Sequence, residues 1–370
     1  MENARARRAL PIIAAAVVTI LVAAFVYLRP PLSPSPPRTA ESATPWTLDP
    51  AYQVAYDFVT PSVGWAVLAR GDTNHIDYWI FVTADGTRHW KLQASATTDA
   101  FEASVDLRFF DLEHGYAVIG RQVGLATADG GAHWTHVRFP VSTDLEVTFT
   151  DPKHGWFVGG EQPFDAGGGP FPFYSTADGG STWARLPLAP GGGLAFRDAH
   201  EGWAIDLGDT VFSTDDGGET WSAHRLPQGR VPNDRGVLEP NEVRLLPKRG
   251  VMVTSGLFAF TSQDGGATWR PVVTPPGARI FDIAFQDATH WWAMPSGNLF
   301  KTSDAGQTWT HVSLQFDDWQ YRVGVIDARH AWARLDQSTG SQDPLRGTAL
   351  ALTTDGGVHW DYANVPRPPA

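Results

Sequence analysis

The sequence predicts an all-β protein, a seven-bladed β-propeller preceded by one N-terminal transmembrane helix. Two observations predict the propeller: an eight-residue pattern recurs seven times, and a second short motif precedes it in nearly every unit. A repeat with turn residues and an aromatic in each unit is typical of architectures in which no unit buries its own hydrophobic face. A third observation, a charge-free apolar run near the N-terminus, predicts the helix.

The recurring pattern, the Asp motif, reads Ser/Thr-x-Asp-Gly-Gly-x-Thr-Trp in its fullest form, and its tryptophans are 38 to 51 residues apart. The carboxylate can accept hydrogen bonds from its own turn, and the glycines supply positive φ, so we expect a turn between the third and fourth strands of each blade. The copies are Thr83–Trp90, Thr127–Trp134, Thr176–Trp183, Thr214–Trp221, Ser262–Trp269, Thr302–Trp309 and Thr353–Trp360.

The Asp motif is interpreted as structural. Aspartates in seven separate blades cannot converge on one ligand, so a catalytic or metal-binding ring is not expected. The aspartates are Asp85, Asp129, Asp178, Asp216, Asp264, Asp304 and Asp355. The tryptophans, expected between sheets, are Trp90, Trp134, Trp183, Trp221, Trp269, Trp309 and Trp360. If Trp221 is buried, its replacement by alanine should cost about 3–5 kcal/mol.

The second motif reads Asp-x-x-His-Gly-Trp in its fullest form. An alternating strand such as Leu145–Phe149 precedes it, and a strand such as Asp209–Ser213 leads into the Asp motif. Four short strands per unit describe a propeller blade. The copies are Thr60–Trp65, Asp111–Tyr116, Asp151–Trp156, Asp198–Trp203, Asp287–Trp292 and Asp327–Trp332. Histidines recur at one turn position in four blades, so they predict no shared metal site: His114, His154, His290 and His330.

The N-terminal segment predicts a location. Arg5, Arg7 and Arg8 precede the charge-free run Ala9–Leu28, which is 20 residues long and about enough to cross a bilayer core of roughly 30 Å. We expect a cytoplasmic basic stub at 1–8, a signal anchor at 9–28, a Pro-rich linker at 29–45 and a propeller at 46–366. The protein would be a single-pass plasma-membrane protein with an extracytoplasmic propeller. A cleaved signal peptide is the alternative, although no small-x-small site ends the run.

Charge and cysteine content narrow the partners. The chain carries a net charge of −12, and its basic N-terminal stub leaves the remainder more acidic still. Such a domain is a poor candidate for binding nucleic acid. The chain contains no cysteine, which excludes disulfides and thiolate metal sites. No metal and no cofactor are expected.

One polar constellation is predicted at the mouth of the central channel. Aligning the innermost strands on the residue that closes each one places Ala55, Asp106, Glu146, Gly193, Glu242, Asp282 and Arg322 at one position. Arg108 and Arg244 follow two residues later. Carboxylates and arginines there could bind a cation or a basic peptide. The alternative is that these side chains are simply solvated strand starts.

Loop lengths predict which face of the ring binds. The turns within both motifs are uniform, and the connections on the opposite face vary widely. Function tends to lie in variable loops on a rigid scaffold. The long connections are Arg70–Tyr78, Glu161–Phe173, Gln228–Asn241 and Asp336–Gly347. Ring closure stays open: His359–Val365 predicts a fourth strand for the last blade, and Trp46–Leu48 could add an edge strand.

These motifs carry a family resemblance. The Asp motif is the Asp box of the bacterial neuraminidase repeat. Its pairing with the second motif resembles the photosystem II stability/assembly-factor-like propellers over roughly residues 51–363. The resemblance implies a non-catalytic scaffold that binds a membrane-protein or peptide partner, since photosynthetic members are implied to assist membrane-complex assembly. The apparent uncleaved anchor departs from those members.

The alternative function is a glycoside hydrolase of sialidase type, because sialidases share the Asp box. That chemistry needs arginines for a substrate carboxylate and a tyrosine nucleophile. Tyr321 beside Arg322 is the candidate nucleophile, and the nearest string to the sialidase Arg-Ile-Pro signature, Arg230-Val-Pro232, lies in mid-chain. A non-catalytic binding module therefore fits the sequence better.

Overall fold

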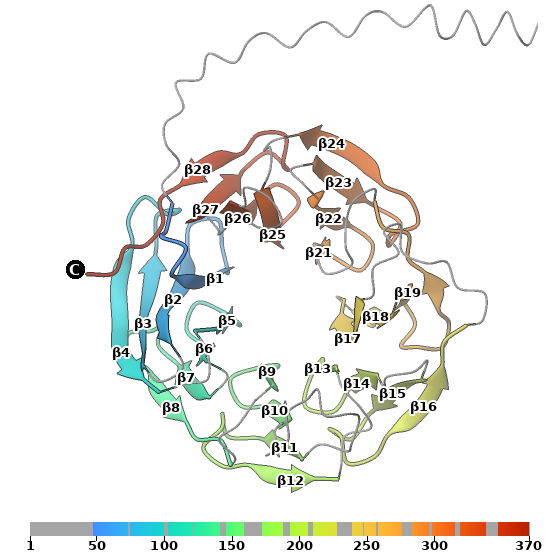
Figure 1. The fold of residues 1–370 in the computed structure, drawn as a ribbon. Coiled ribbons are helices and arrows are strands. Elements are labelled where there is room, and N and C mark those ends of the chain that lie inside the picture. The colour runs from blue at the N-terminus through green and yellow to red at the C-terminus, as the bar shows by residue number, and fades with distance from the viewer. Residues whose placement is uncertain are drawn as a thin grey trace, which may run out of the picture. The chain divides into compact units, whose positions relative to one another are not determined.

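The structure is a computed structural model whose described residues all lie within Pro45–Ala370. The described residues are 47–72, 75–99, 103–120, 122–140, 146–158, 172–187, 193–205, 210–227, 239–246, 248–256, 258–275, 283–295, 298–314, 319–337 and 347–369. They form seven four-stranded antiparallel sheets, which we number as blades 1 to 7 in chain order. Figure 1 shows the sheets arranged as a ring. The seven-bladed propeller is confirmed.

Each blade uses four consecutive strands, ordered from the centre of the ring outward. Blade 1 comprises β1 (Gln53–Phe58), β2 (Gly64–Asp72), β3 (His75–Thr83) and β4 (Lys91–Thr98). Blade 2 comprises β5 (Val105–Phe109), β6 (Gly115–Ile119), β7 (Val123–Thr127) and β8 (Thr135–Val137). Blade 3 comprises β9 (Glu146–Phe149), β10 (Gly155–Val158), β11 (Phe173–Thr176) and β12 (Ala184–Leu186).

The remaining four blades repeat this order. Blade 4 comprises β13 (Leu194–Phe196), β14 (Gly202–Ile205), β15 (Thr210–Thr214) and β16 (Ser222–Arg225). Blade 5 comprises β17 (Glu239–Leu245), β18 (Val251–Gly256), β19 (Phe258–Ser262) and β20 (Arg270–Pro271). Blade 6 comprises β21 (Ile283–Phe285), β22 (Trp291–Ala293), β23 (Asn298–Thr302) and β24 (Thr310–Leu314). Blade 7 comprises β25 (Trp319–Val325), β26 (Ala331–Gln337), β27 (Gly347–Thr353) and β28 (Asp361–Ala363).

The second motif explains how one blade contacts the next. In blade 3 the motif glycine, Gly155, packs against the ring of Phe149 on the inner strand of the same blade. A Cβ at this position would come within 2.5 Å of that ring. The motif aromatic then packs on the following blade: Trp156 stacks on Phe196 with ring centroids 3.8 Å apart and planes 3° from parallel. The glycine is therefore needed for close packing between the first two strands, and the aromatic for packing between blades.

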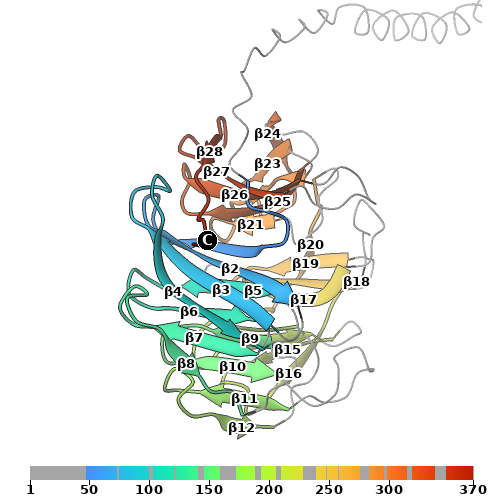
Figure 2. The same cartoon turned by 60° about the vertical axis from the view of Figure 1, so that its left-hand side comes forward.

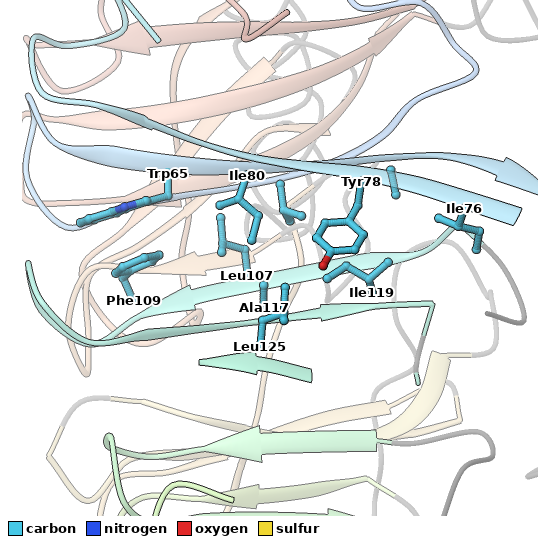
Figure 3. Close-up of a cluster of buried hydrophobic side chains, with 11 residues drawn as sticks. Trp65, Ile76, Tyr78, Ile80, Leu107, Phe109, Ala117, Ile119 and Leu125 are labelled. Atoms are coloured by element: carbon cyan, nitrogen blue, oxygen red, sulfur yellow. The ribbon is translucent and has the colours of Figure 1, made fainter. Parts of the chain in front are cut away.

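The core is divided among the seams between blades. The described buried hydrophobic residues form seven clusters, one between each pair of neighbouring sheets. Figure 3 shows the cluster between blades 1 and 2, where Trp65 lies over Phe109 and Ile80 faces Leu107. Because each sheet is covered on both faces by its neighbours, a single blade cannot keep its core from water.

The Asp-motif tryptophans are less buried than the sequence suggested. Trp221 is only partly buried, and its ring meets Phe196 edge-on at 6.1 Å. By contrast, Trp65, Trp156 and Trp203 of the second motif are at most 3% exposed. The expectation of about 3–5 kcal/mol for a fully buried aromatic therefore applies to the second motif, and the value for Trp221 is lower.

Both ends of the propeller sequence close the ring at the seam between blades 7 and 1. The last blade has its own fourth strand, β28. Of the edge strand expected at Trp46–Leu48, the described residues show a single antiparallel bridge between Leu48 and Thr348 of β27. The two backbone hydrogen bonds of this bridge measure 2.8 and 3.1 Å, and Leu48 is 4% exposed. From the C-terminal side, the Asn364 carbonyl accepts a 2.7 Å bond from Trp90 of blade 1.

The predicted anchor at residues 9–28 lies outside the described residues. Within the described part of the chain, no helix has the length and hydropathy needed to span a bilayer.

Candidate functional site

The carboxylate of each Asp motif is hydrogen-bonded within its own turn. In blade 4 the carboxylate of Asp216 accepts a 2.9 Å bond from the Thr220 N–H and a 2.5 Å bond from its hydroxyl. The Thr214 hydroxyl donates to the same carboxylate at 2.7 Å, and the Gly218 N–H donates to that hydroxyl at 2.9 Å. Gly218 has φ near 98°, which suits glycine. All of these bonds stay within one turn, as a structural role requires.

Hydrogen bonding makes these aspartates strongly acidic. Chiefly the Thr220 hydroxyl, then its N–H, lowers the pKa of Asp216 to about 2. Thr182 lowers the pKa of Asp178 to about 2 in the same way. Where histidine replaces the threonine, its ring contacts the carboxylate in place of the hydroxyl. The His133 Nδ1 atom lies 2.6 Å from the Asp129 carboxylate. Such carboxylates are ionised at neutral pH and poorly suited to proton transfer.

The second-motif histidines are used locally too. The Nδ1 atoms of His154 and His330 each lie 2.8 Å from the carboxylate of the same turn, Asp151 and Asp327. Among the described residues, no group of three or more histidine or acidic side chains could hold a metal ion.

The structure places five of the seven charged residues predicted at the channel mouth. Asp106 and Arg108 lie on β5, Glu242 and Arg244 on β17, and Arg322 on β25. Glu146 begins β9, but its side chain is outside the described part, as is all of Asp282. Most of the long connections on the predicted binding face, including 161–171, 228–238 and 338–346, are also outside it. Binding by that face stays a prediction.

Asp106 is the best-defined of the predicted carboxylates. It faces the solvent at the ring centre, yet the surrounding strands desolvate it enough to raise its pKa. The positive charges of Arg108 and Arg322 act in the opposite direction and offset part of this rise. The fold therefore brings Asp106, Arg108 and Arg322 into one electrostatic environment, although they come from blades 2 and 7.

Asp57 is a carboxylate of this region that the sequence reasoning missed. It lies on β1, and its carboxylate accepts a 2.6 Å hydrogen bond from the Phe109 N–H of blade 2. Burial raises its pKa, while that bond and Arg108 lower it in part. A signal was available, because Asp57 occupies in blade 1 the aligned position that Arg108 and Arg244 occupy in their blades.

A cavity of about 560 Å³ lies among the inner strands of blades 2 to 6. This volume falls within the range of about 300–1,000 Å³ that is typical of ligand pockets. Arginines, threonines and aromatic rings dominate its wall, and no acidic residue is part of the described lining. The lining residues are Arg108, Tyr116, Thr148, Phe149, Thr150, Ala195, Phe196, Arg197, Arg244, Leu245, Leu246 and Phe285.

Two of the predicted residues, Arg108 and Arg244, line this central cavity, and Asp106, Glu242 and Arg322 do not. The cavity also includes Thr150 and Arg197, which directly precede second-motif turns. It therefore extends from the middle of the inner strands toward the motif turns, the opposite direction from the predicted mouth.

The three arginines of the central cavity differ in their bonding. Arg197 holds blade 4 to blade 5, because its Nη atoms donate to the carbonyls of Leu246 at 2.7 Å and Gly250 at 2.8 Å. Its Nε also donates to Glu201 at 3.1 Å. The Arg244 Cζ atom lies over the Phe285 ring at 4.6 Å, a cation–π contact between blades 5 and 6.

This geometry suits an anionic group more than a reaction. Guanidinium groups bind carboxylates in a bidentate manner, and nearby aromatic rings favour an apolar side chain next to that carboxylate. Of the three arginines in the wall, Arg197 pairs with Glu201, and Arg108 acts on the nearby carboxylates Asp57 and Asp106. Fold and site together define an Asp-box propeller with an arginine-lined central cavity.

Comparisons with known proteins agree with this class. The family described as "Photosynthesis system II assembly factor YCF48" matches residues 82–191. A solved structure described as "YCF48 bound to D1 peptide" has a TM-score of 0.52 at 17% identity, covering 84% of this chain and 99% of that chain. YCF48 from Cyanidioschyzon merolae has a TM-score of 0.53 at 17% identity, covering 82% and 98%. The resemblance to the photosystem II assembly-factor-like propellers is therefore confirmed.

A curated relative belongs to a different functional class. An oligoxyloglucan-reducing end-specific xyloglucanase from Emericella nidulans is 29% identical over 126 residues, which is 32% of this chain. The match spans only 15% of that relative's length.

Proposed function

We propose that the protein is a membrane-anchored, extracytoplasmic, non-catalytic scaffold that binds an extended peptide segment of a partner protein. The observation that carries the proposal is the central cavity with Arg108 and Arg244 in its wall and no acidic lining residue among those described. A ligand carboxylate, from a chain terminus or an acidic side chain, is the group that this wall attracts. The structural relative described as bound to a D1 peptide supports a peptide as ligand class.

The anchor and location are part of the same proposal. The apolar run Ala9–Leu28 follows three arginines, which favours an N-terminus in the cytoplasm and a propeller on the other side of the membrane. The proline-rich residues that follow would act as a semi-rigid spacer. A partner that is itself a membrane protein would then be within reach.

The test is co-purification with the full-length chain from solubilised host membranes. The chain itself should resist extraction from those membranes by alkaline carbonate. The test variant carries Arg108→Ala and Arg244→Ala. The control carries Arg138→Ala and Arg185→Ala, which remove the same charge from exposed positions, directly after the outer strand β8 and on the outer strand β12. We expect one partner to be retained by the wild type and the control and lost, by roughly tenfold or more, from the test variant.

A synthetic peptide from that partner then identifies the recognised group. Fluorescence anisotropy should show weaker binding when the peptide's carboxylate is amidated, because the guanidinium groups lose their charge partner. Equal retention by the test and control variants would refute the cavity as the binding site.

A glycoside hydrolase is the second candidate, and the xyloglucanase relative is the observation that favours it. Glycosidases generally use two carboxylates, one with a raised pKa as general acid. Asp57 and Asp106 are the carboxylates of the ring centre with raised pKa values. Hydrolysis of xyloglucan oligosaccharides or a sialoside by the wild type, lost in Asp106→Asn, would replace the scaffold proposal with this one.

A further inference from the structure

The outer strand of blade 1 differs from the outer strands of the other six blades. β4 is eight residues long, and the others have two to five. An edge strand presents a row of backbone N–H and C=O groups to which another strand can add, and proteins limit this by shortening such strands. The outer strands of six blades are short in this way, and that of blade 1 is not. Figure 2 shows the long strands of blade 1 beside the shorter ones of blade 2.

The outer strand of blade 1 also differs from most of the others in having no proline in it or near its ends. A proline lies in five of the short outer strands or within three residues of their ends, where it removes a backbone donor. These are Pro140, Pro187, Pro227, Pro271 and Pro366. β4 contains no proline, and from Leu92 to Thr98 it contains no charge. The stretch Ala94–Thr98, which follows the β-bulge at Gln93, thus has neither proline nor charge to keep it from pairing.

The outer edge of β4 is uncovered in the described part of the protein. β4 pairs with β3 from Lys91 to Thr98, with a β-bulge at Gln93, and the pairing is regular from Ala94 to Thr98. Among the described residues, no backbone group from Ala94 to Thr98 has a hydrogen-bond partner outside β3. The C-terminal segment packs only beside the start of the strand, where Val365 shares a cluster with Leu92. The open stretch is therefore Ala94–Thr98, on the outside of the ring (Figure 1).

The sequence of β4 is complementary to itself in antiparallel orientation. A two-fold axis through Ser95 would place Ala94 opposite Ala96, and the bulged Gln93 near Thr97. The same register brings Lys91 of each copy toward Asp99 of the other, so opposite charges meet at both ends. Between them lie only small or uncharged side chains, and Ser95, Ala96 and Thr97 are exposed.

We propose that β4 is a dimerisation edge, at which two copies of this chain pair antiparallel and join two blades into one eight-stranded sheet. Such a contact is isologous, because each copy contributes the same strand. The acidic charge of the chain opposes association elsewhere on the surface. At β4 that repulsion is replaced by two lysine–aspartate pairs.

Cysteine cross-linking tests the register. The chain has no cysteine of its own, so Ser95→Cys introduces a single thiol that would face its own copy across the axis. Cβ atoms directly opposite in an antiparallel pair are about 4.5–5.5 Å apart, close to the separation that a disulfide needs. The control is Ser222→Cys, an exposed serine on the outer strand β16.

Mild oxidation of the full-length chain should convert most of the Ser95→Cys protein to a disulfide-linked dimer on a non-reducing gel and little of the Ser222→Cys protein. Equal dimer yields from the two variants would overturn the proposal.

Charge substitution at the axis tests it without a covalent bond. Ser95→Lys and Ser95→Glu each place like charges opposite one another, so each should sediment as a monomer where the wild type is a dimer. Mixing the two variants should restore the dimer, because lysine then faces glutamate. A wild type that sediments as a monomer would overturn the proposal, and an edge reserved for another protein's strand would give that result. Dimers that persist in both separate variants would overturn it as well.

Discussion

The Asp motif and the second motif are both repeated around the ring, but they stabilise it in different ways. In the Asp motif of blade 4, the carboxylate of Asp216 bonds only to residues of its own turn. In the second motif of blade 3, Trp156 leaves its own blade, stacks on Phe196 and donates a 2.9 Å hydrogen bond to the Gly217 carbonyl. The carboxylate of the more regular motif therefore stabilises its own turn. The aromatic residue of the less regular motif joins two blades, with an Asp-motif glycine as its hydrogen-bond acceptor.

The difference follows from what each motif has to contact. A turn that satisfies its own hydrogen bonds needs the same residues in every blade, so its sequence repeats closely. A side chain that crosses a seam must fit the inner strand of the next blade, and those strands differ. Blade 6 shows the consequence: Trp291 stands where blades 1 to 4 have glycine, and it meets Phe285 of its own blade edge-on at 5.1 Å.

The largest test of this comparison is a pair of tryptophan substitutions. Trp156→Ala should lower the free energy of unfolding by about 3–5 kcal/mol, because it removes a fully buried ring from a seam. Trp221→Ala should cost about 2 kcal/mol, because part of that ring already meets water. Urea unfolding followed by tryptophan fluorescence measures both. A larger loss for Trp221 than for Trp156 would reverse the roles that we assign to the two motifs.

A smaller effect is expected from the turn itself. Asp216→Ala removes the acceptor for three hydrogen bonds and should cost about 1–2 kcal/mol, as the loss of a helix cap does. Asp215→Ala is the matched control, since this neighbouring aspartate is exposed and accepts none of those three bonds. Its effect should stay within about 0.5 kcal/mol. Equal melting temperatures for the two variants would show that the carboxylate contributes nothing beyond its charge.

The fold could be predicted from the sequence because its signals are local. Seven Asp motifs give the number of blades, and alternating strands between turns give four strands in each. Burial was harder to predict, because it depends on the neighbouring blade. The Asp-motif tryptophans appeared to be the core residues, yet the fully buried indoles are those of Trp65, Trp156, Trp203, Trp291 and Trp292.

The candidate site was only partly predictable. Alignment of the inner strands identified Arg108 and Arg244, which do line the central cavity. It missed Arg197, which follows β13 and lies outside the two strand positions that the alignment compared. It also missed Asp57, whose contact with the Phe109 N–H depends on how blade 2 sits against blade 1. The central cavity is formed by side chains from five blades. The repeat pattern in the sequence does not show which of these side chains lie close together in space.

The smallest effect is a pH dependence of the Asp-motif contribution. The Thr220 hydroxyl and N–H lower the pKa of Asp216 to about 2 from an ordinary value of 3.8. Because the folded state favours the ionised carboxylate, its contribution is complete above about pH 4 and is lost as the pH falls toward 2. The stability difference between the wild type and Asp216→Ala should therefore shrink over that interval. The pH dependence contributed by Asp57 has the opposite sign, because burial raises the pKa of its carboxyl in the folded protein. Urea midpoints of both proteins at pH 5, 4, 3 and 2.5 measure the difference, and a constant gap across the series would contradict an ionised Asp216 as the acceptor that holds the turn.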